Sequence, residues 1–357
     1  MILNVNQISP ILFSAFPTQK RKEGNQGTRE TQYYYKDVVC AFDIETTRLK
    51  IGEKRISKTV KKDVEVSIMY IWQFQVGTDI TIIGRTWEEF KTLMQYIKTA
   101  LKDNEKLVCY IHNASYEFQF LRDENVLGKE IDEKSVFLLS PRKILKFDAL
   151  DGKINFRCSY IHSNMNLADW TDKLKVKHGK LSGKEFNYDK LRFPWTPLSD
   201  KEMQYCCNDV IGLVECIYKE MEIDGDNLYT IPLTSTGYVR RDIRKAVRDL
   251  PRGWVTERKP DYETYRMLHN AFRGGNTHAN RYDVNTIKNE HICEYDRSSS
   301  YPDVQLNGLF PIEKFSKPRE TTKELFNLAI ERNYAVIADI QFFRYKNKER
   351  GDSSIYI

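Results

Sequence analysis

Two carboxylates lie two residues apart in Asp43-Ile44-Glu45, directly after the apolar run Val38 to Phe42. The run predicts a buried strand that ends at these acids. Residues i and i+2 of a strand point to the same side, so both carboxylates can face one site. Oxygen ligands of this kind suit Mg²⁺ and similar hard cations. Alone, however, an Asp-x-Glu pair is more commonly surface charge.

A third acid, Glu117, belongs to a polar turn that follows the predicted strand Leu107–Ile111. Ligands of α/β proteins bind beyond the carboxyl ends of the strands, which is where this turn lies. The simpler alternative is that Asn113 caps the next helix and that Glu117 is favoured by the positive end of that helix.

A fourth acid, Asp209, is predicted to lie on a helix that begins with the capping box Ser199-Asp200-Lys201-Glu202 and runs to about Ile223. Tyr205 and Asp209 are four residues apart, so they share a helix face. Because its neighbours are apolar, Asp209 needs a partner or an ion. A core tyrosine beside a chance aspartate is the alternative.

In this order, the three motifs resemble those of proofreading 3′→5′ exonucleases with the ribonuclease-H-like fold. The resemblance implies that two ions, Mg²⁺ or Mn²⁺, are held by Asp43, Glu45, Glu117 and Asp209, and that Tyr205 orients the attacking water. It also implies contacts with the single-stranded 3′ end of DNA from Thr46, Asn113 and Tyr116, and from either Ser163 or Asn164. Glu117 stands where the family usually has Asp. The catalytic lysine expected downstream is either Lys180 or Lys184.

Two further motifs occur in the second half of the chain. Phe272-Arg273-Gly274-Gly275 is similar to the Tyr-x-Gly-Gly element of family-B DNA polymerases, and Asp296 to Pro302 resembles their motif A. The resemblance implies that Arg273, Gly274 and Gly275 contact DNA. It also implies that Asp296 is catalytic and binds metal, and that Ser299 and Tyr301 bind the incoming nucleotide. The remaining palm motifs are not found in this sequence, so we expect no primer extension by this chain.

The chain as a whole resembles the N-terminal portion of protein-primed, phage-type family-B DNA polymerases. We expect an α/β fold, in which a ribonuclease-H-like domain with a mixed sheet flanked by helices precedes an incomplete palm. The expected parts are a flexible arm (1–36), the exonuclease domain (37–224), a helical linker (225–270) and the partial palm with motif A (271–357). The implied partners are DNA (a single-stranded 3′ end or a primer–template), a terminal priming protein and, only with a completed palm, deoxynucleotides. The implied location is the cytoplasm of a phage-infected or prophage-carrying bacterium.

Local patterns predict the remaining elements. Val66–Val76 with Asp79–Gly84, and Lys143–Phe147 with Lys153–Cys158, are predicted hairpins. Helices are expected over 86–101, 238–247 and 321–331, and strands over 291–295 and 334–343.

Composition limits the function classes. No apolar run approaches the roughly 18 residues that span a bilayer, and the seven cysteines follow neither a disulfide nor a zinc pattern. The net charge of +6 includes basic clusters at 173–184 and 240–259, which suit a polyanion or form solvated helix faces. Two alternatives to the polymerase fragment stay open: a stand-alone exonuclease, and a non-catalytic module that binds DNA or the priming protein.

Overall fold

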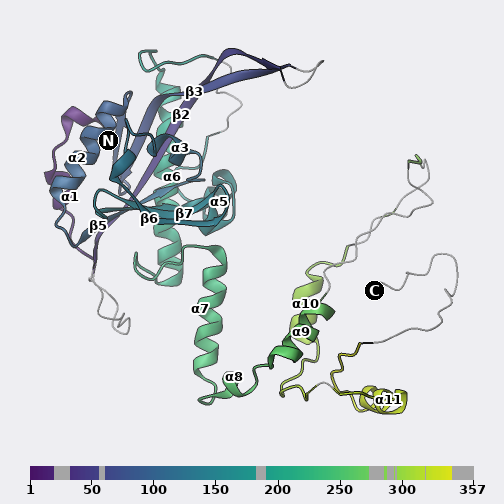
Figure 1. Cartoon of the computed structure of the whole chain (residues 1–357). Helices are drawn as coiled ribbons and strands as arrows, with labels where there is room; N and C mark the ends of the chain where they lie inside the picture. The colour runs from purple at the N-terminus through teal and green to yellow at the C-terminus, as the bar shows by residue number, and fades with distance from the viewer. Residues whose placement is uncertain are drawn as a thin grey trace. The chain divides into compact units, whose positions relative to one another are not determined.

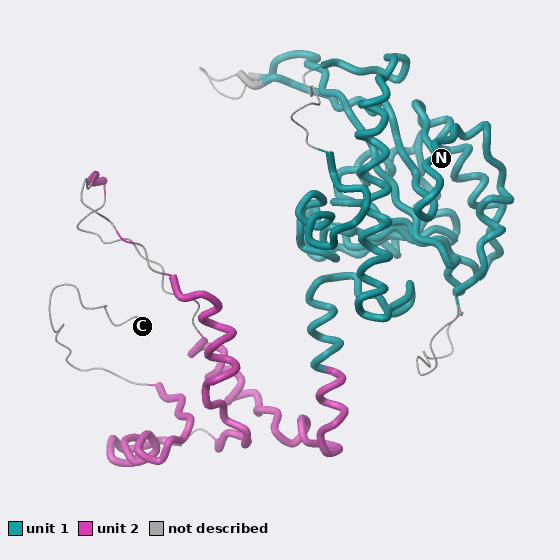
Figure 2. The backbone as a smooth tube through the Cα atoms, turned by 180° about the vertical axis from the view of Figure 1, so that it is seen from behind, with its two compact units in different colours: residues 1–243 teal, residues 244–357 magenta. Residues whose placement is uncertain are grey.

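The computed structural model describes residues 1–19, 33–55, 61–181, 190–272, 285–287, 293, 296–317 and 319–339. The chain divides into two compact units, residues 1–243 and residues 244–357 (Figure 2). Each unit is described by itself. Among the described residues, no helix is long and apolar enough to cross a membrane.

Unit 1 is built on a mixed eight-stranded sheet with the order β1-β4-β3-β2-β5-β8-β7-β6 (Figure 1). The strands are β1 Ile2–Asn4, β2 Tyr34–Arg55, β3 Lys61–Val76, β4 Ile80–Gly84, β5 Glu105–Ile111, β6 Ile131–Ser140, β7 Lys143–Ala149 and β8 Ile154–Cys158. The central strands β2, β5 and β8 are parallel, whereas β3 and β7 are antiparallel to their neighbours. The expected fold class, a mixed sheet flanked by helices, is confirmed, and so are both predicted hairpins.

Helices cover both faces of this sheet. They are α1 Ile11–Ser14, α2 Trp87–Ala100, α3 Glu117–Leu121, α4 Ser159–Ser163, α5 Leu167–Leu174 and α6 Asp200–Asp224, with short 3₁₀ turns at Val5–Gln7 and Gly128–Glu130. Helix α7 Ser235–Arg248 follows them and spans the division between the two units. The predicted starts of α2 and α6 are confirmed, because Thr86 and Ser199 both form capping boxes. Gly225 ends α6 in the left-handed conformation at φ 62°.

The alternating side chains of β2 divide the core into two layers. Cys40 and Phe42 belong to the layer that contains Phe90 of α2. Val39 and Ala41 point to the opposite face and pack in the layer formed with α6. Since side chains alternate along a strand, Asp43 and Glu45 continue the face that α6 covers. The hydrophobic pattern of the strand therefore sets the direction of its two acids.

The N-terminal residues correct one expectation. We expected residues 1–36 to form a flexible arm, but β1 pairs in parallel with β4, and Phe13 is fully buried against the edge of Phe74. The ammonium of Lys36 donates to the carbonyl of Phe16, at 3.0 Å. Apolar burial thus ties residues 1–19 into the domain, while residues 20–32 lie outside the described part of the chain.

Strand β2 also corrects the expectation that the first strand ends at Asp43 to Glu45. It continues to Arg55, and its partner β3 begins at Lys61. The extension contains Thr46, Thr47, Leu49 and Ile51, residue types that favour strands. A register shift lies at Glu45/Thr46. We call the paired segments 48–55 and 61–67 the β2–β3 ribbon.

Unit 2 contains α8 Trp254–Glu257, α9 Tyr262–Ala271, α10 Ser300–Asn307 and α11 Lys323–Glu331. The expected helix near 321–331 is confirmed as α11, with Thr322 as its N-cap. The expected strand over 334–343 is wrong for residues 334–339, which form no strand, and its other residues lie outside the described part. The expected strand at 291–295 lies outside it too, except for Cys293.

Candidate metal centre

Three of the predicted carboxylates converge on one side of the sheet. Carboxylate oxygens of Asp43, Glu45 and Asp209 lie within 4.8 Å of one another. Asp43 and Glu45 come from β2, and Asp209 comes from the α6 face that packs on this strand. Tyr205 lies one helical turn before Asp209 and is buried beside Ile71 of β3. The arrangement fits the ligand set of a divalent cation.

Glu117 completes the acidic cluster at the start of α3. Glu117 is only 4% exposed, and its carboxyl group lies close enough to that of Asp43 for a hydrogen bond when one of the two is protonated. Asn113 lets the chain turn sharply after β5, because it adopts the left-handed conformation at φ 65°. Glu117 contacts Asp43 but is not one of the three acids whose oxygens lie mutually within 4.8 Å. The side chain of Glu117 therefore joins the cluster through its contact with Asp43.

Proton affinity is high throughout the cluster. Burial and the nearby charge of Asp209 raise the pKa of Asp43 to about 7. Burial and the charge of Asp43 raise the pKa of Glu45 to about 8. The same causes raise the pKa of Glu117 well above its usual value, and burial raises that of Asp209. Clustered buried carboxylates repel one another when ionised, so the site requires either protons or cations.

Two buried oxygens indicate that the site can accept a cation. Glu117 Oε2 and Asp209 Oδ1 have no hydrogen-bond partner in the described part of the chain. Unpaired buried carboxylate oxygens are costly, and they are the oxygens that a cation would satisfy. An all-carboxylate donor set suits Mg²⁺ or Mn²⁺ rather than softer metals. The residues therefore fit a divalent metal.

Lys180 is the basic residue of the site. Its ammonium lies 2.8 Å from Asp209 Oδ2. Although burial lowers the pKa of Lys180, the charges of Asp209, Asp43 and Glu45 raise it above its usual value. Burial lowers the pKa of His112, and the charge of Lys180 lowers it further, to about 4. Lys184, the other residue considered for this role, lies outside the described residues.

The backbone before Lys180 is fixed on α6. His178 donates its backbone N–H to Glu215 and pairs with the same carboxylate through Nδ1, at 2.7 Å. A Cβ at Gly212 would stand 2.2 Å from the His178 carbonyl oxygen. The Asn208 amide donates to the carbonyl of Gly179, at 3.4 Å. Gly212 and Glu215 were missed in the sequence, where one Gly within a helix carries no sign of the segment packed on it.

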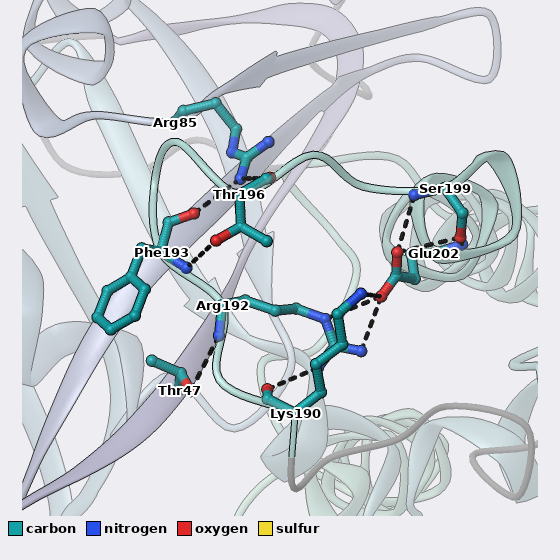
Figure 3. A network of polar contacts seen from close by, with 8 residues as sticks. All are labelled: Thr47, Arg85, Lys190, Arg192, Phe193, Thr196, Ser199 and Glu202. Carbon is teal, nitrogen blue, oxygen red and sulfur yellow. Dashed lines mark hydrogen bonds and ion pairs between the residues drawn. The ribbon is translucent and has the colours of Figure 1, made fainter.

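Arg192 was also missed. It is buried, and its guanidinium donates to Glu202 Oε1 at 2.8 Å (Figure 3). Its backbone N–H donates to Thr47, two residues after Glu45. Burial raises the pKa of Glu202, but hydrogen bonds from Ser199 and Arg192 lower it to about 2. The capping box marked Glu202 only as a helix cap, although it also anchors the arginine that runs beside the acidic cluster.

Arg85 holds the same segment from the other side. Its guanidinium donates to the carbonyls of Phe193 and Thr196, at 3.0 and 2.8 Å (Figure 3). Its Nε donates to the carbonyl of Tyr70 in β3. Two arginines thus fix residues 192–199 between the sheet and the start of α6, the helix that carries Asp209.

The residues expected to contact DNA differ in their surroundings. The hydroxyls of Thr46 and Tyr116 lie 2.6 Å apart, and Tyr116 is 41% exposed. Asn113 is exposed in the turn that follows β5. The Ser163 hydroxyl instead donates to the backbone carbonyls of Ser159 and Met165. Thr46 and Tyr116 therefore form a polar pair, whereas Ser163 is occupied within the chain.

The expected polymerase residues in unit 2 form no comparable cluster. Asp296 and Ser299 are exposed, as is Tyr301 at 70%. Ser299 precedes α10 in the left-handed conformation, at φ 53°. The described residues offer no other group of acids that could hold a metal with Asp296. Arg273, Gly274 and Gly275 lie outside the described part of the chain.

Comparisons with known proteins give fold similarity only. No family model and no curated protein match the chain. Solved structures similar to this chain include phi29 DNA polymerase complexed with primer-template DNA and incoming nucleotides, with a TM-score of 0.47, 13% identity and 70% of this chain covered. Another is phi29 DNA polymerase complexed with single-stranded DNA, with a TM-score of 0.48, 13% identity and 69% covered. The chain spans 41% of the length of each.

Proposed function

We propose that unit 1 is a 3′→5′ exonuclease that hydrolyses DNA phosphodiesters with two divalent cations. We further propose that the chain is the N-terminal part of a protein-primed family-B DNA polymerase. The observation that carries the first proposal is the convergence of Asp43, Glu45 and Asp209, with the carboxyl group of Glu117 beside that of Asp43. These acids come from three separate elements, and two of their buried oxygens have no partner among the described residues.

The residues divide the work of phosphodiester hydrolysis. The four carboxylates would hold the cations, which supply charge neutralisation at phosphate and a water of lowered pKa. Lys180 places a fixed positive charge beside Asp209, where it favours negative charge that develops on the phosphate. Tyr205 lies one turn from Asp209 on the same helix and would orient the attacking water.

Thr46 and Tyr116 would hold the terminal nucleotide. Their hydroxyls form one polar pair, and Thr46 immediately follows Glu45. The half-exposed ring of Tyr116 offers a surface on which a base can stack. An exposed Asn113 in the adjoining turn adds an amide that can bond the sugar or base.

The polymerase part of the proposal depends on unit 2. Asp296, Ser299 and Tyr301 would belong to a palm that binds deoxynucleotides when its other motifs are supplied. Phosphoryl transfer needs metals held from more than one element, which Asp296 alone does not provide. DNA, primer–template and a terminal priming protein are the proposed partners of the completed enzyme.

The exonuclease proposal is tested with the purified chain and 5′-labelled single-stranded DNA. We expect shortening from the 3′ end with Mg²⁺ or Mn²⁺, and no shortening with a chelator. Asp43→Ala with Glu45→Ala should abolish it. A matched control is Glu124→Ala with Glu133→Ala, which removes two exposed acids of unit 1 that belong neither to the acidic cluster nor to the β2–β3 ribbon. Full activity in the first double variant would refute the assigned site.

A further inference from the structure

The β2–β3 ribbon has no support from the rest of the sheet. The parallel pairing of β2 with β5 ends at Ala41, and the pairing of β3 with β4 begins at Trp72. Beyond these residues, β2 and β3 pair only with each other among the described strands, up to Arg55 and Lys61. Figure 1 shows the two strands running on together past the other strands. A two-stranded hairpin alone is marginally stable, so its length calls for a binding role.

The ribbon starts at the candidate metal centre. Glu45 is followed by Thr46, whose hydroxyl contacts Tyr116, and by Thr47, which accepts the N–H of Arg192. The eight residues from Arg48 to Arg55 then span about 25 Å at about 3.3 Å per residue. Whatever occupies the metal centre can thus extend along the ribbon.

The ribbon segment is strongly basic. Residues 48–55 and 61–67 contain six Lys and Arg and three Asp and Glu, so they contribute +3 to a chain whose net charge is +6. Lys50 is paired with Asp63, at 2.8 Å, and with Glu53. Arg48 and Lys54 are exposed and have no ion-pair partner among the described residues. Their charges are free to neutralise phosphates.

We infer that the β2–β3 ribbon binds the sugar-phosphate backbone of the DNA strand whose 3′ end enters the metal centre. This rests on the proposed exonuclease function. A polyanion fits because unpaired cations on one extended element release counterions when they neutralise phosphates. The apolar residues Ile51 and Val66, 59% and 42% exposed, would instead suit a protein partner.

The main test reverses two charges of the ribbon. We compare Arg48→Glu with Lys54→Glu against the matched control Lys102→Glu with Lys219→Glu, which changes two exposed lysines, one of them near the start of β5 and the other late in α6. Binding of a single strand of roughly 20 nucleotides is followed by fluorescence anisotropy in chelator at several salt concentrations. The ribbon variant should bind at least roughly 10-fold more weakly, and its salt slope should fall by about 1.4 for two lost phosphate contacts.

Rates of hydrolysis distinguish a defect in the ribbon from a defect in the metal centre. With Mg²⁺, the ribbon variant should degrade the long strand more slowly but hydrolyse a trinucleotide at the unchanged rate, because the short substrate does not reach the ribbon. A wild-type chain that hydrolyses neither substrate refutes the exonuclease. In that case, the anisotropy comparison still tests whether the ribbon binds DNA.

A shortened ribbon gives an independent variant. Replacing residues 50–65 by Asn-Gly joins Leu49 to Val66, which are paired in register, through a two-residue hairpin. It should bind the long strand as weakly as the charge variant. Unchanged affinity in both variants overturns the inference. Unchanged affinity together with an altered oligomeric state on gel filtration would assign the ribbon to a protein contact instead.

Discussion

The two units treat similar aspartates differently. In unit 1, Asp43 is surrounded by Asp209, Glu45 and Glu117 from other parts of the fold, and proton affinity rises throughout the group. In unit 2, Asp296 is exposed and has no such neighbours among the described residues. A motif thus becomes a chemical site only when packed elements bring its partners within a few ångströms.

The difference also lies in what holds the acids. Asp209 is fixed by a helix with a capping box, buried apolar residues and the ion pair to Lys180. The helix α10 that follows Asp296 exposes large apolar side chains, including Tyr301 and Leu306. Exposed apolar side chains of this size indicate a surface that binds another partner.

The largest expected effect compares these two aspartates directly. Asp209→Asn should lower exonuclease activity by more than the roughly 10–100-fold that outer-shell changes cost metal sites, since a ligand itself is lost. Asp296→Asn should leave it within about twofold. Rates on 5′-labelled single-stranded DNA with Mg²⁺ provide the measurement. Equal losses in both variants would remove the distinction between the units.

The next effect concerns the positioning of Lys180. Gly212→Ala brings a Cβ to 2.2 Å from the His178 carbonyl oxygen, so the backbone before Lys180 must move. Activity should fall by roughly 10–100-fold, as for outer-shell changes at metal sites. Gly179→Ala is the matched control in the same segment, because its Cβ would meet only Thr171 at an ordinary 3.8 Å. Similar activity in both variants would show that the close approach at Gly212 does not matter.

Sequence reasoning identified the acids of unit 1 because strand and helix periods place them locally. Asp43 and Glu45 follow an alternating buried strand, and the capping box at Ser199 sets the register of Tyr205 and Asp209. It failed for contacts between distant segments. Nothing near Gly212 indicates His178, and nothing near Thr47 indicates Arg192. The ribbon was missed because its short alternation of apolar and charged residues, with Leu49 and Ile51 in one strand and Val64 and Val66 in the other, buries none of the described side chains and stands among many lysines and arginines.

A smaller effect links the acidic cluster to pH. The raised pKa values, about 7 for Asp43 and about 8 for Glu45, mean that the folded state binds more protons than the unfolded state between about pH 4 and pH 8. The contribution of these two acids to the stability of the metal-free protein is therefore greatest below this window and is lost as pH rises through it. Divalent cations compete with these protons, so they should stabilise the fold above the window and not below it.

Thermal unfolding in chelator and in Mg²⁺ measures this effect. We expect Mg²⁺ to raise Tm by roughly 5 °C at pH 8.5 and to have no effect at pH 5. In Asp43→Asn with Glu45→Gln, both the pH dependence and the Mg²⁺ effect should shrink. An equal Mg²⁺ effect at both pH values would argue that the ion binds outside the cluster.

The smallest expected effect comes from removing most of unit 2. Helix α7 is anchored on unit 1 by Arg241, which pairs with Asp224 at 3.0 Å and with Asp226, and by Tyr238, whose hydroxyl lies 3.4 Å from His162 Nε2. A chain that ends after Arg248 keeps all these contacts and the whole acidic cluster. Its Tm for the first unfolding transition should change by less than about 2 °C, and its rate on a trinucleotide should equal that of the full chain. A large loss on the trinucleotide would mean that residues beyond 248 contribute to hydrolysis. It would contradict the assignment of the whole reaction to unit 1.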